Sequence, residues 1–193
     1  MRVSFRGAAR EVTGSRHLVT VGLQTIALDC GLFQGRRATS HAKNQELPLA
    51  PEHLHAVVLS RAHIDHSGRL PYLVRRGYAN TLWTTPATRD LCALMLADSA
   101  HIQQQDAAHL AKHYKSFIAP LYDQKDVKRT IDTMVTVPYN RPFDVADGIG
   151  AGFVDAGHIL GSAITILECR EQRNHRTLVY TGNIGRYGQP DHP

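Results

Sequence analysis

The chain has 193 residues, a formal net charge of +5, and 42% hydrophobic and 20% charged residues, the ordinary composition of one globular domain. This composition argues against a disordered, collagen-like or coiled-coil chain, and no stretch approaches the roughly 20 apolar residues of a membrane span. Cys30, Cys92 and Cys169 are odd in number and form no C-x-x-C pair, which favours a reducing cytoplasm over a disulfide framework. The mild positive charge suits a polyanionic partner such as RNA.

The first half of the chain alternates short apolar runs with glycine-rich turns, a pattern typical of a sheet. It predicts strands over residues 2–6, 16–21, 25–28 and 56–60, of which the last is almost continuously apolar and therefore buried. After this strand, Ser67 is expected to cap a helix that carries Leu70, Leu73 and Val74 on its apolar face and ends at Gly77.

The second half begins with a short strand at residues 82–84, after which Thr85 and Pro86 supply the start signals of a long helix. This helix is expected to run to about Ala111, with an apolar stripe made of Leu91, Leu94, Met95 and Ile102. A second helix is predicted over residues 123–134, where Val127, Ile131 and Met134 follow helical spacing. Strands follow at residues 143–145, 149–154, 163–167 and 177–180. The order predicts an α/β (α+β) domain with two sheets, or one folded sheet, flanked by helices.

Two histidines and an aspartate cluster directly after the predicted buried strand, in the order His63, Asp65, His66. Ligands in α/β proteins gather at the carboxyl ends of strands, and imidazole with carboxylate suits zinc or a similar divalent ion. The cluster alone leaves a second interpretation open, in which two surface histidines flank an aspartate that caps a helix.

Further motifs accompany this cluster in a fixed order along the chain. They are GAAREVTGS at 7–15, LDCGLFQG at 28–35, SRAHIDHSG at 60–68, DAGHILGSA at 155–163 and YTGNIGR at 180–186. Together they resemble the metallo-β-lactamase superfamily, and within it the β-CASP branch of RNA-processing nucleases. The resemblance implies an αββα sandwich with two zinc ions at one edge, and it covers essentially the whole chain.

The resemblance also implies roles for individual residues. His63, Asp65, His66 and His158 match metal ligands of the family, while Asp29 matches a carboxylate that orders the metal loop without binding the metal. Asp65 and Asp29 are therefore the carboxylates expected to serve catalysis. In the family, the zinc ions activate a hydroxide that attacks an RNA phosphodiester, because a metal lowers the pKa of water toward about 7.

Two positions depart from the family pattern. Arg61 stands where the family has the first histidine of H-x-H-x-D-H, and Asn183 stands where it has a metal-bridging aspartate. Arginine is always protonated and offers no lone pair, and a neutral amide oxygen is a poor bridge between two dications. We therefore expect at most one weakly held zinc ion, and RNA cleavage that is weakened or lost.

Residues 1–193 are expected to form the N-terminal part of a metallo-β-lactamase-like domain, without the β-CASP domain or the C-terminal elements that complete the sandwich in the family. An open sheet edge would then favour self-association. Two other functions stay open. One is a non-catalytic pseudoenzyme or truncated remnant, in which Arg61 fills the metal cavity and pairs with Asp65 or Asp29. The other is a superfamily hydrolase that acts on a small ester or thioester.

Overall fold

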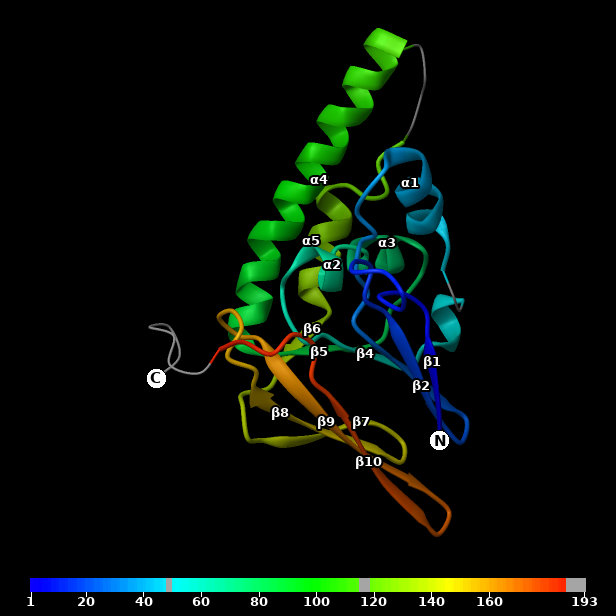
Figure 1. Ribbon diagram of the computed structural model, residues 1–193, viewed down its shortest axis with the longest axis vertical. Coiled ribbons are helices and arrows are strands. Elements are labelled where there is room, and N and C mark those ends of the chain that lie inside the picture. Colours follow the sequence, from blue (N-terminus) through cyan, green and yellow to red (C-terminus); the bar gives the residue numbers. More distant parts are fainter. Residues whose placement is uncertain (48–49, 115–118, 187–193) are drawn as a thin grey trace.

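Two sheets and a layer of helices make up the fold (Figure 1). The computed structural model describes residues 1–47, 50–114 and 119–186. A six-stranded sheet in the order β1-β2-β3-β4-β5-β6 lies between the helices and a four-stranded sheet in the order β10-β9-β8-β7. The α/β class and the two-sheet prediction are confirmed. The second helical layer expected from the sandwich, on the outer face of the four-stranded sheet, is not formed by the described residues.

The six-stranded sheet changes direction at its centre. Its first three strands are antiparallel and its last three continue in parallel. The strands are β1 (Arg2–Phe5), β2 (His17–Val21), β3 (Gln24–Leu28), β4 (Ala56–Val58), β5 (Leu82–Thr84) and β6 (Met134–Thr136). Because β3 and β4 are parallel neighbours, the segments that follow them leave from the same edge of the sheet, and this edge carries the His63–His66 loop.

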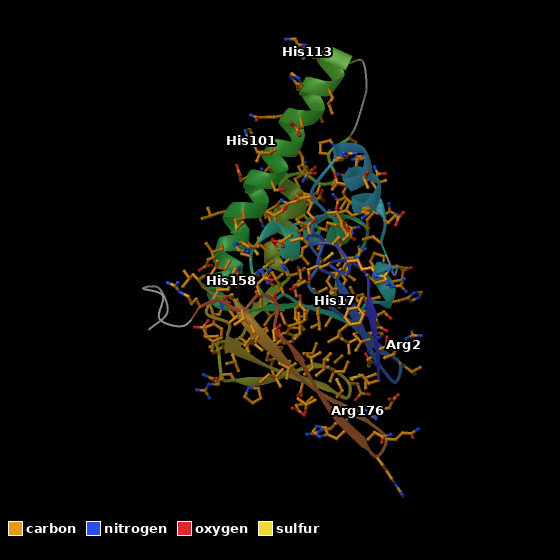
Figure 2. The ribbon with its side chains drawn as sticks, viewed as in Figure 1. Arg2, His17, His101, His113, His158 and Arg176 are labelled. Carbon is orange, nitrogen blue, oxygen red and sulfur yellow. The ribbon has the colours of Figure 1, made fainter. Side chains whose placement is uncertain are left out.

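The helices lie on one side of this sheet, where apolar side chains from both fill the first core. They are α1 (Arg37–Gln45), α2 (Ile64–Ser67), α3 (Leu70–Arg75), α4 (Pro86–Tyr114) and α5 (Gln124–Asp132), with a 3₁₀ turn at Pro51–His53. The C-terminal half of α4 projects beyond the sheets, and His101 and His113 lie on that projection (Figure 2). None of the helices in the described part combines the length and apolarity needed to cross a membrane.

The four-stranded sheet is a fully antiparallel meander. Its strands are β7 (Pro142–Ala146), β8 (Ile149–Asp155), β9 (Ala163–Glu171) and β10 (Asn174–Tyr180). Burial alternates along β8 and β9, because successive side chains point to opposite faces. The inward face, with Phe153 fully buried, packs on the six-stranded sheet and forms the second core.

Two local predictions are wrong, and one helix was not predicted. Ser67 does not cap α3: it ends α2, and its hydroxyl donates backwards to the carbonyl oxygen of Ala62 at 2.7 Å. Met134 does not end a helix, because α5 stops at Asp132 and Met134 pairs with Leu82 as the start of β6. Helix α1 was not predicted at all, since its mostly polar sequence shows no apolar stripe.

The buried stripe of α4 also differs from the prediction. Leu94 and Ile102 are 72% and 50% exposed, whereas Cys92, Leu96 and Ala100 are fully buried. These three residues repeat every fourth position, so they share one face of the helix. Small side chains at Cys92 and Ala100 let α4 pack closely on its neighbours. Leu91 and Met95 of the predicted stripe pack against the same core, while Leu94 and Ile102 lie on the solvent side.

The second core offers a stability test. We expect Phe153→Ala to lower the free energy of unfolding by about 3–5 kcal/mol, because it empties a fully buried aromatic site between the sheets. Leu94→Ala, at an exposed position, is the matched control and should change it by less than about 0.5 kcal/mol. Urea unfolding followed by circular dichroism measures both, and equal losses would contradict the core assignment.

Candidate functional site

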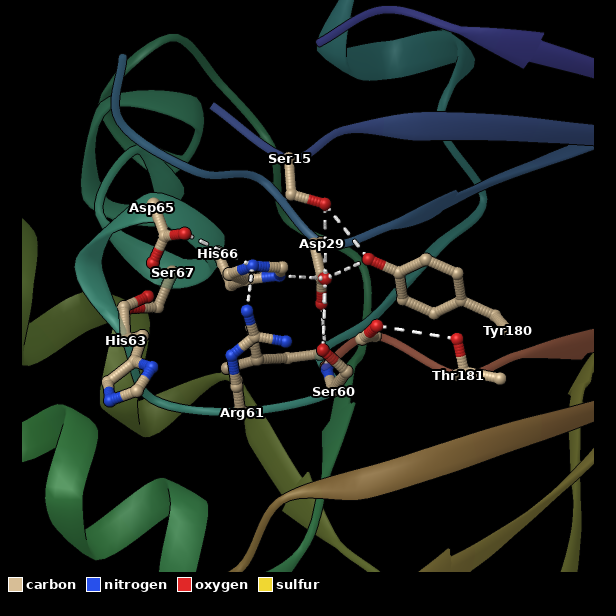
Figure 3. A network of polar contacts seen from close by, with 12 residues as sticks. Ser15, Asp29, Ser60, Arg61, His63, Asp65, His66, Ser67, Tyr180 and Thr181 are labelled. Carbon is tan, nitrogen blue, oxygen red and sulfur yellow. Dashed lines mark hydrogen bonds and ion pairs between the residues drawn. The ribbon is translucent and has the colours of Figure 1, made fainter. Parts of the chain in front are cut away.

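The candidate site lies where loops from both sheets meet at one edge (Figure 3). Asp29 directly follows β3, and the loop from Ser60 to His66 follows β4. The β8–β9 loop contributes His158, and the segment after β10 covers the site from the other side. Two backbone hydrogen bonds join these loops: Ala163 N donates to Ser60 O at 2.8 Å, and Gly185 N donates to Ala156 O at 2.9 Å.

Asp29 is the fully buried centre of the polar network. Its carboxylate accepts hydrogen bonds from Ser60 N at 2.8 Å, Ser60 Oγ at 2.9 Å and Tyr180 Oη at 2.6 Å, and His66 Nδ1 lies 2.5 Å away. Burial alone would raise the pKa of Asp29, but His66 and these donors hold it below its ordinary value. The backbone of Asp29 is left-handed at φ +62°, a conformation that aspartate tolerates better than most residues. Asp29 therefore ties three distant segments together.

His66 lies between the two carboxylates of the site. Its Nδ1 faces Asp29, and its Nε2 lies 3.3 Å from Oδ2 of Asp65. Burial lowers the pKa of His66, but the two carboxylates outweigh burial and raise that pKa to about 9. Nη2 of Arg61 also contacts His66 Nε2, the nitrogen that faces away from Asp29. The ring is thus held on both of its nitrogens by other side chains.

Arg61 is buried inside the site, with 1% of its surface exposed. The expectation that it pairs with Asp65 or Asp29 is wrong: within the described ranges it forms no ion pair with a carboxylate, because Asp29 is filled by other donors and Arg61 contacts His66 instead. Its Nε and Nη1 have no hydrogen-bond partner among the described residues. Burial lowers the pKa of Arg61, although the negative charges of Asp29 and Asp65 act to raise it.

His63 and His158 lie next to each other at the partly exposed side of the site. Their rings meet edge to face, with centroids 5.2 Å apart. Burial lowers the pKa of both imidazoles, and the positive charge of Arg61 lowers it further. The loop that carries His158 is anchored by the start of α4, where the hydroxyls of Thr85 and Thr88 donate to Gly161 O at 2.6 and 2.8 Å.

The segment after β10 packs over Arg61. A Cβ atom at Gly182 would lie 3.0 Å from Arg61 Nη1, and Gly182 has a φ of +56°, so glycine suits this position on both counts. A Cβ at Gly185 would overlap Gly157 O at 1.5 Å, which shows how closely the segment lies against the His158 loop. Asn183, between these glycines, has an exposed side chain.

Sequence reasoning therefore found the residues that the fold brings together, namely Asp29, His63, Asp65, His66 and His158, with Arg61 among them. It assigned no site role to Tyr180, Ser60 or Ser15, whose hydroxyls surround Asp29. Tyr180 is 151 residues from Asp29 along the chain, so no local pattern reveals their contact. The sequence offered one signal for them: each of the three is the first or last residue of one of the five ordered motifs.

Curated relatives resemble nearly the whole chain. A ribonuclease of Thermus thermophilus is 35% identical over 186 residues, which cover 96% of this chain and 38% of that protein. The transcription termination factor FttA of Methanocaldococcus jannaschii is 33% identical over 95% of this chain and 27% of its own length. These relatives resemble the chain in sequence, and solved metallo-β-lactamase structures resemble it in fold.

The chain has the metallo-β-lactamase fold, and its sequence resembles RNA-processing relatives of the β-CASP type. Among solved structures, the Rm3 metallo-β-lactamase superposes with a TM-score of 0.52 and 22% identity, over 92% of this chain and 60% of that enzyme. A metallo-β-lactamase of Cronobacter sakazakii superposes with a TM-score of 0.54 and 16% identity, over 97% and 58%. No family model matches the chain. The chain spans less than half the length of the curated relatives cited above.

Nucleases of the metallo-β-lactamase superfamily generally depend on metal ions, and the donor set of this chain does not fit a pair of them. In the part of the chain that the structure describes, no three His, Cys, Asp or Glu side chains converge as metal ligands. The guanidinium of Arg61 lies against Nε2 of His66, where a metal would need the nitrogen lone pair. A fixed positive charge at that place repels a second cation.

Proposed function

We propose that this β-CASP-type chain is related to RNA phosphodiester hydrolases and that its own metal-dependent cleavage is weakened or lost. Two observations support the RNA part: the relatives are named a ribonuclease and a transcription termination factor, and they match nearly all of this chain. This chain spans 38% and 27% of the lengths of those relatives. RNA as its substrate is therefore a proposal that rests on what the relatives are named.

One observation carries the proposal that activity is weakened: Arg61 contacts Nε2 of His66, the ring nitrogen that does not face Asp29. A guanidinium has five N–H donors and no lone pair, so it takes the space of a ligand without replacing it. Asn183 adds to this effect, since an amide cannot supply the charge of a bridging carboxylate. The proposed metal ligands are therefore His63, Asp65, His66 and His158, with Asp29 as their support, and they would hold at most one zinc ion weakly.

A non-catalytic role is the second candidate, and the polar network favours it. Both carboxylate oxygens of Asp29 lie near donors of the chain itself, and both ring nitrogens of His66 contact other side chains. Asp29 and His66 therefore have partners from the protein itself and do not need a metal, although Nε and Nη1 of Arg61 have none among the described residues. The fold would then persist after the loss of cleavage.

The cleavage experiment tests both candidates. We expect that the unmodified chain, incubated with end-labelled single-stranded RNA and zinc or manganese, shows no turnover above background. Loss of one transition-state stabiliser costs roughly 10² to 10³ in rate, and here a ligand and a bridging charge are both replaced. His63→Ala is the control, because cleavage that survives this change comes from a contaminant. Chelator-sensitive turnover that His63→Ala abolishes would refute weakened activity, and hydrolysis of a thioester but not RNA would refute the substrate class.

A further inference from the structure

Two exposed histidines lie next to each other on the projecting half of α4. His109 and His113 are four residues apart, so they share one face of the helix. Their ring centroids are 4.5 Å apart, and the ring planes are tilted by 35°. Thr88, at the other end of α4, holds the loop of His158, and a helical rise of about 1.5 Å per residue places His109 about 30 Å further along the helix. The pair is therefore accessible and lies outside the candidate site (Figure 2).

Two imidazoles one helical turn apart can bind the same metal ion. Cβ atoms at positions i and i+4 are about 5–6 Å apart, and a metal–imidazole bond is about 2.0–2.1 Å long, so one ion can bridge both rings after small side-chain rotations. Two histidines at this spacing on one helix face also bind zinc in the H-E-x-x-H motif. The rings of His109 and His113 are already in contact, so little side-chain freedom is lost when an ion binds both.

The third exposed histidine of the same helix lacks a histidine at this spacing. His101 has Ala97 and Gln105 four residues away, and its Nε2 lies 2.9 Å from Nε2 of Gln105. A single imidazole holds a metal ion by one bond, whereas two imidazoles on one face hold it by two. His101 therefore serves as the reference for a histidine on α4 that cannot bridge an ion.

The charges around the pair offset each other. Asp106 lies one turn before His109, and Lys112 directly precedes His113 in the sequence. These charges are exposed and screened by salt, so the affinity for a cation depends on the two imidazoles. Within the described residues, no third His, Cys, Asp or Glu side chain joins them to complete a group of metal ligands. An ion bound here would keep water at its other coordination positions.

We propose that His109 and His113 together bind a divalent transition-metal ion. Imidazole suits zinc, nickel and copper ions, and the general order of affinities makes Cu²⁺ the most tightly bound of the three. Two protein ligands are one fewer than a catalytic zinc normally has, so the ion exchanges readily and is removed by dialysis. This site is separate from the proposed RNA cleavage, and neither inference depends on the other.

Ion binding would stabilise a helix end that tertiary packing holds weakly. The C-terminal half of α4 projects beyond the sheets, and the face that carries His109 and His113 is exposed (Figure 1). Such segments open locally more often than a packed core does. A metal bridge between positions i and i+4 requires the helical conformation, so the ion binds the closed form and shifts the local equilibrium toward it.

Paramagnetic broadening by Cu²⁺ in NMR spectra is the direct test, because it locates the ion on the unmodified chain. Substoichiometric Cu²⁺ should broaden the imidazole signals of His109 and His113 before that of His101. His113→Ala should raise the Cu²⁺ concentration that half-broadens the His109 signal at least about tenfold, since one ligand remains. His101→Ala is the matched control and should leave that concentration unchanged. Equal effects of the two variants, or signals of the pair that broaden no earlier than that of His101, would overturn the proposal.

Hydrogen exchange with zinc tests the bridge by its effect on the helix. At a zinc concentration ten times the dissociation constant, amide exchange over residues 105–113 of the unmodified chain should slow about tenfold. In His113→Ala the same zinc concentration should change the exchange little. Exchange that zinc leaves unchanged in the unmodified chain, or slows equally in His113→Ala, would refute the bridge. Neither measurement involves RNA, so its failure leaves the proposed function as it stands.

Discussion

The double change Arg61→His with Asn183→Asp is expected to raise the affinity of the chain for zinc by at least about 100-fold. The first change removes the guanidinium that lies against His66 and supplies an imidazole in its place. The second restores a carboxylate in the segment that packs over the site. Two unit charges about 4 Å apart interact with roughly 4 kcal/mol at an effective dielectric constant of 20. Replacing a cation that lies beside a zinc ion therefore has a large effect on the affinity for zinc. A catalytic zinc also needs about three protein ligands, which the double change makes available.

Elemental analysis after dialysis and competition with a chelating dye measure this gain. The unmodified chain is expected to keep less than one zinc equivalent. Arg61→His alone should give most of the gain, because Arg61 is buried among the ligands whereas Asn183 is exposed. Arg176→His, an exposed position on β10, controls for the addition of a histidine to the surface. Two zinc equivalents in the unmodified chain, or no gain from the double change, would contradict our interpretation of the site.

Asp29→Ala is expected to lower the free energy of unfolding by about 3–5 kcal/mol. Asp29 is fully buried, and its removal leaves Ser60 N, the hydroxyls of Ser60 and Tyr180, and the His66 ring without their acceptor. Removing one partner of a buried ion pair lowers the stability by more than the intact pair contributes, because the other charge then stays buried without a partner. Alanine also tolerates the left-handed backbone at this position poorly. Urea unfolding followed by circular dichroism gives the difference.

Two further variants separate the causes of this loss. Asp29→Asn keeps the shape and tolerates the left-handed backbone, so its smaller loss reports the charge and one acceptor oxygen of the carboxylate without backbone strain. Asp147→Ala removes an exposed aspartate in the turn between β7 and β8 and should change stability by less than about 0.5 kcal/mol. If Asp29→Ala unfolds at the same urea concentration as Asp147→Ala, the network around Asp29 does not stabilise the fold.

Local patterns in the sequence were sufficient for most of the secondary structure and for the cluster of His63, Asp65 and His66 that follows the buried strand. The nearly continuous apolar run at residues 56–60 corresponds to the fully buried strand β4, and Asp123 caps α5 with a reciprocal capping box. Thr85 receives a hydrogen bond from Thr88 N at the start of α4. Such features depend on neighbours a few residues away, so a single sequence contains the information that determines them.

Tertiary packing decided which faces are buried and which polar groups meet. Helical spacing is satisfied equally by Leu94 and by Cys92, and only the position of the neighbouring elements buries Cys92 and leaves Leu94 in solvent. The sequence placed Arg61 beside the ligand residues and showed that it cannot bind a metal. It could not show that Arg61 turns to His66 rather than to Asp29, because Tyr180, 151 residues away, already occupies Asp29. Contacts between such distant segments depend on how the two sheets pack, which no local pattern specifies.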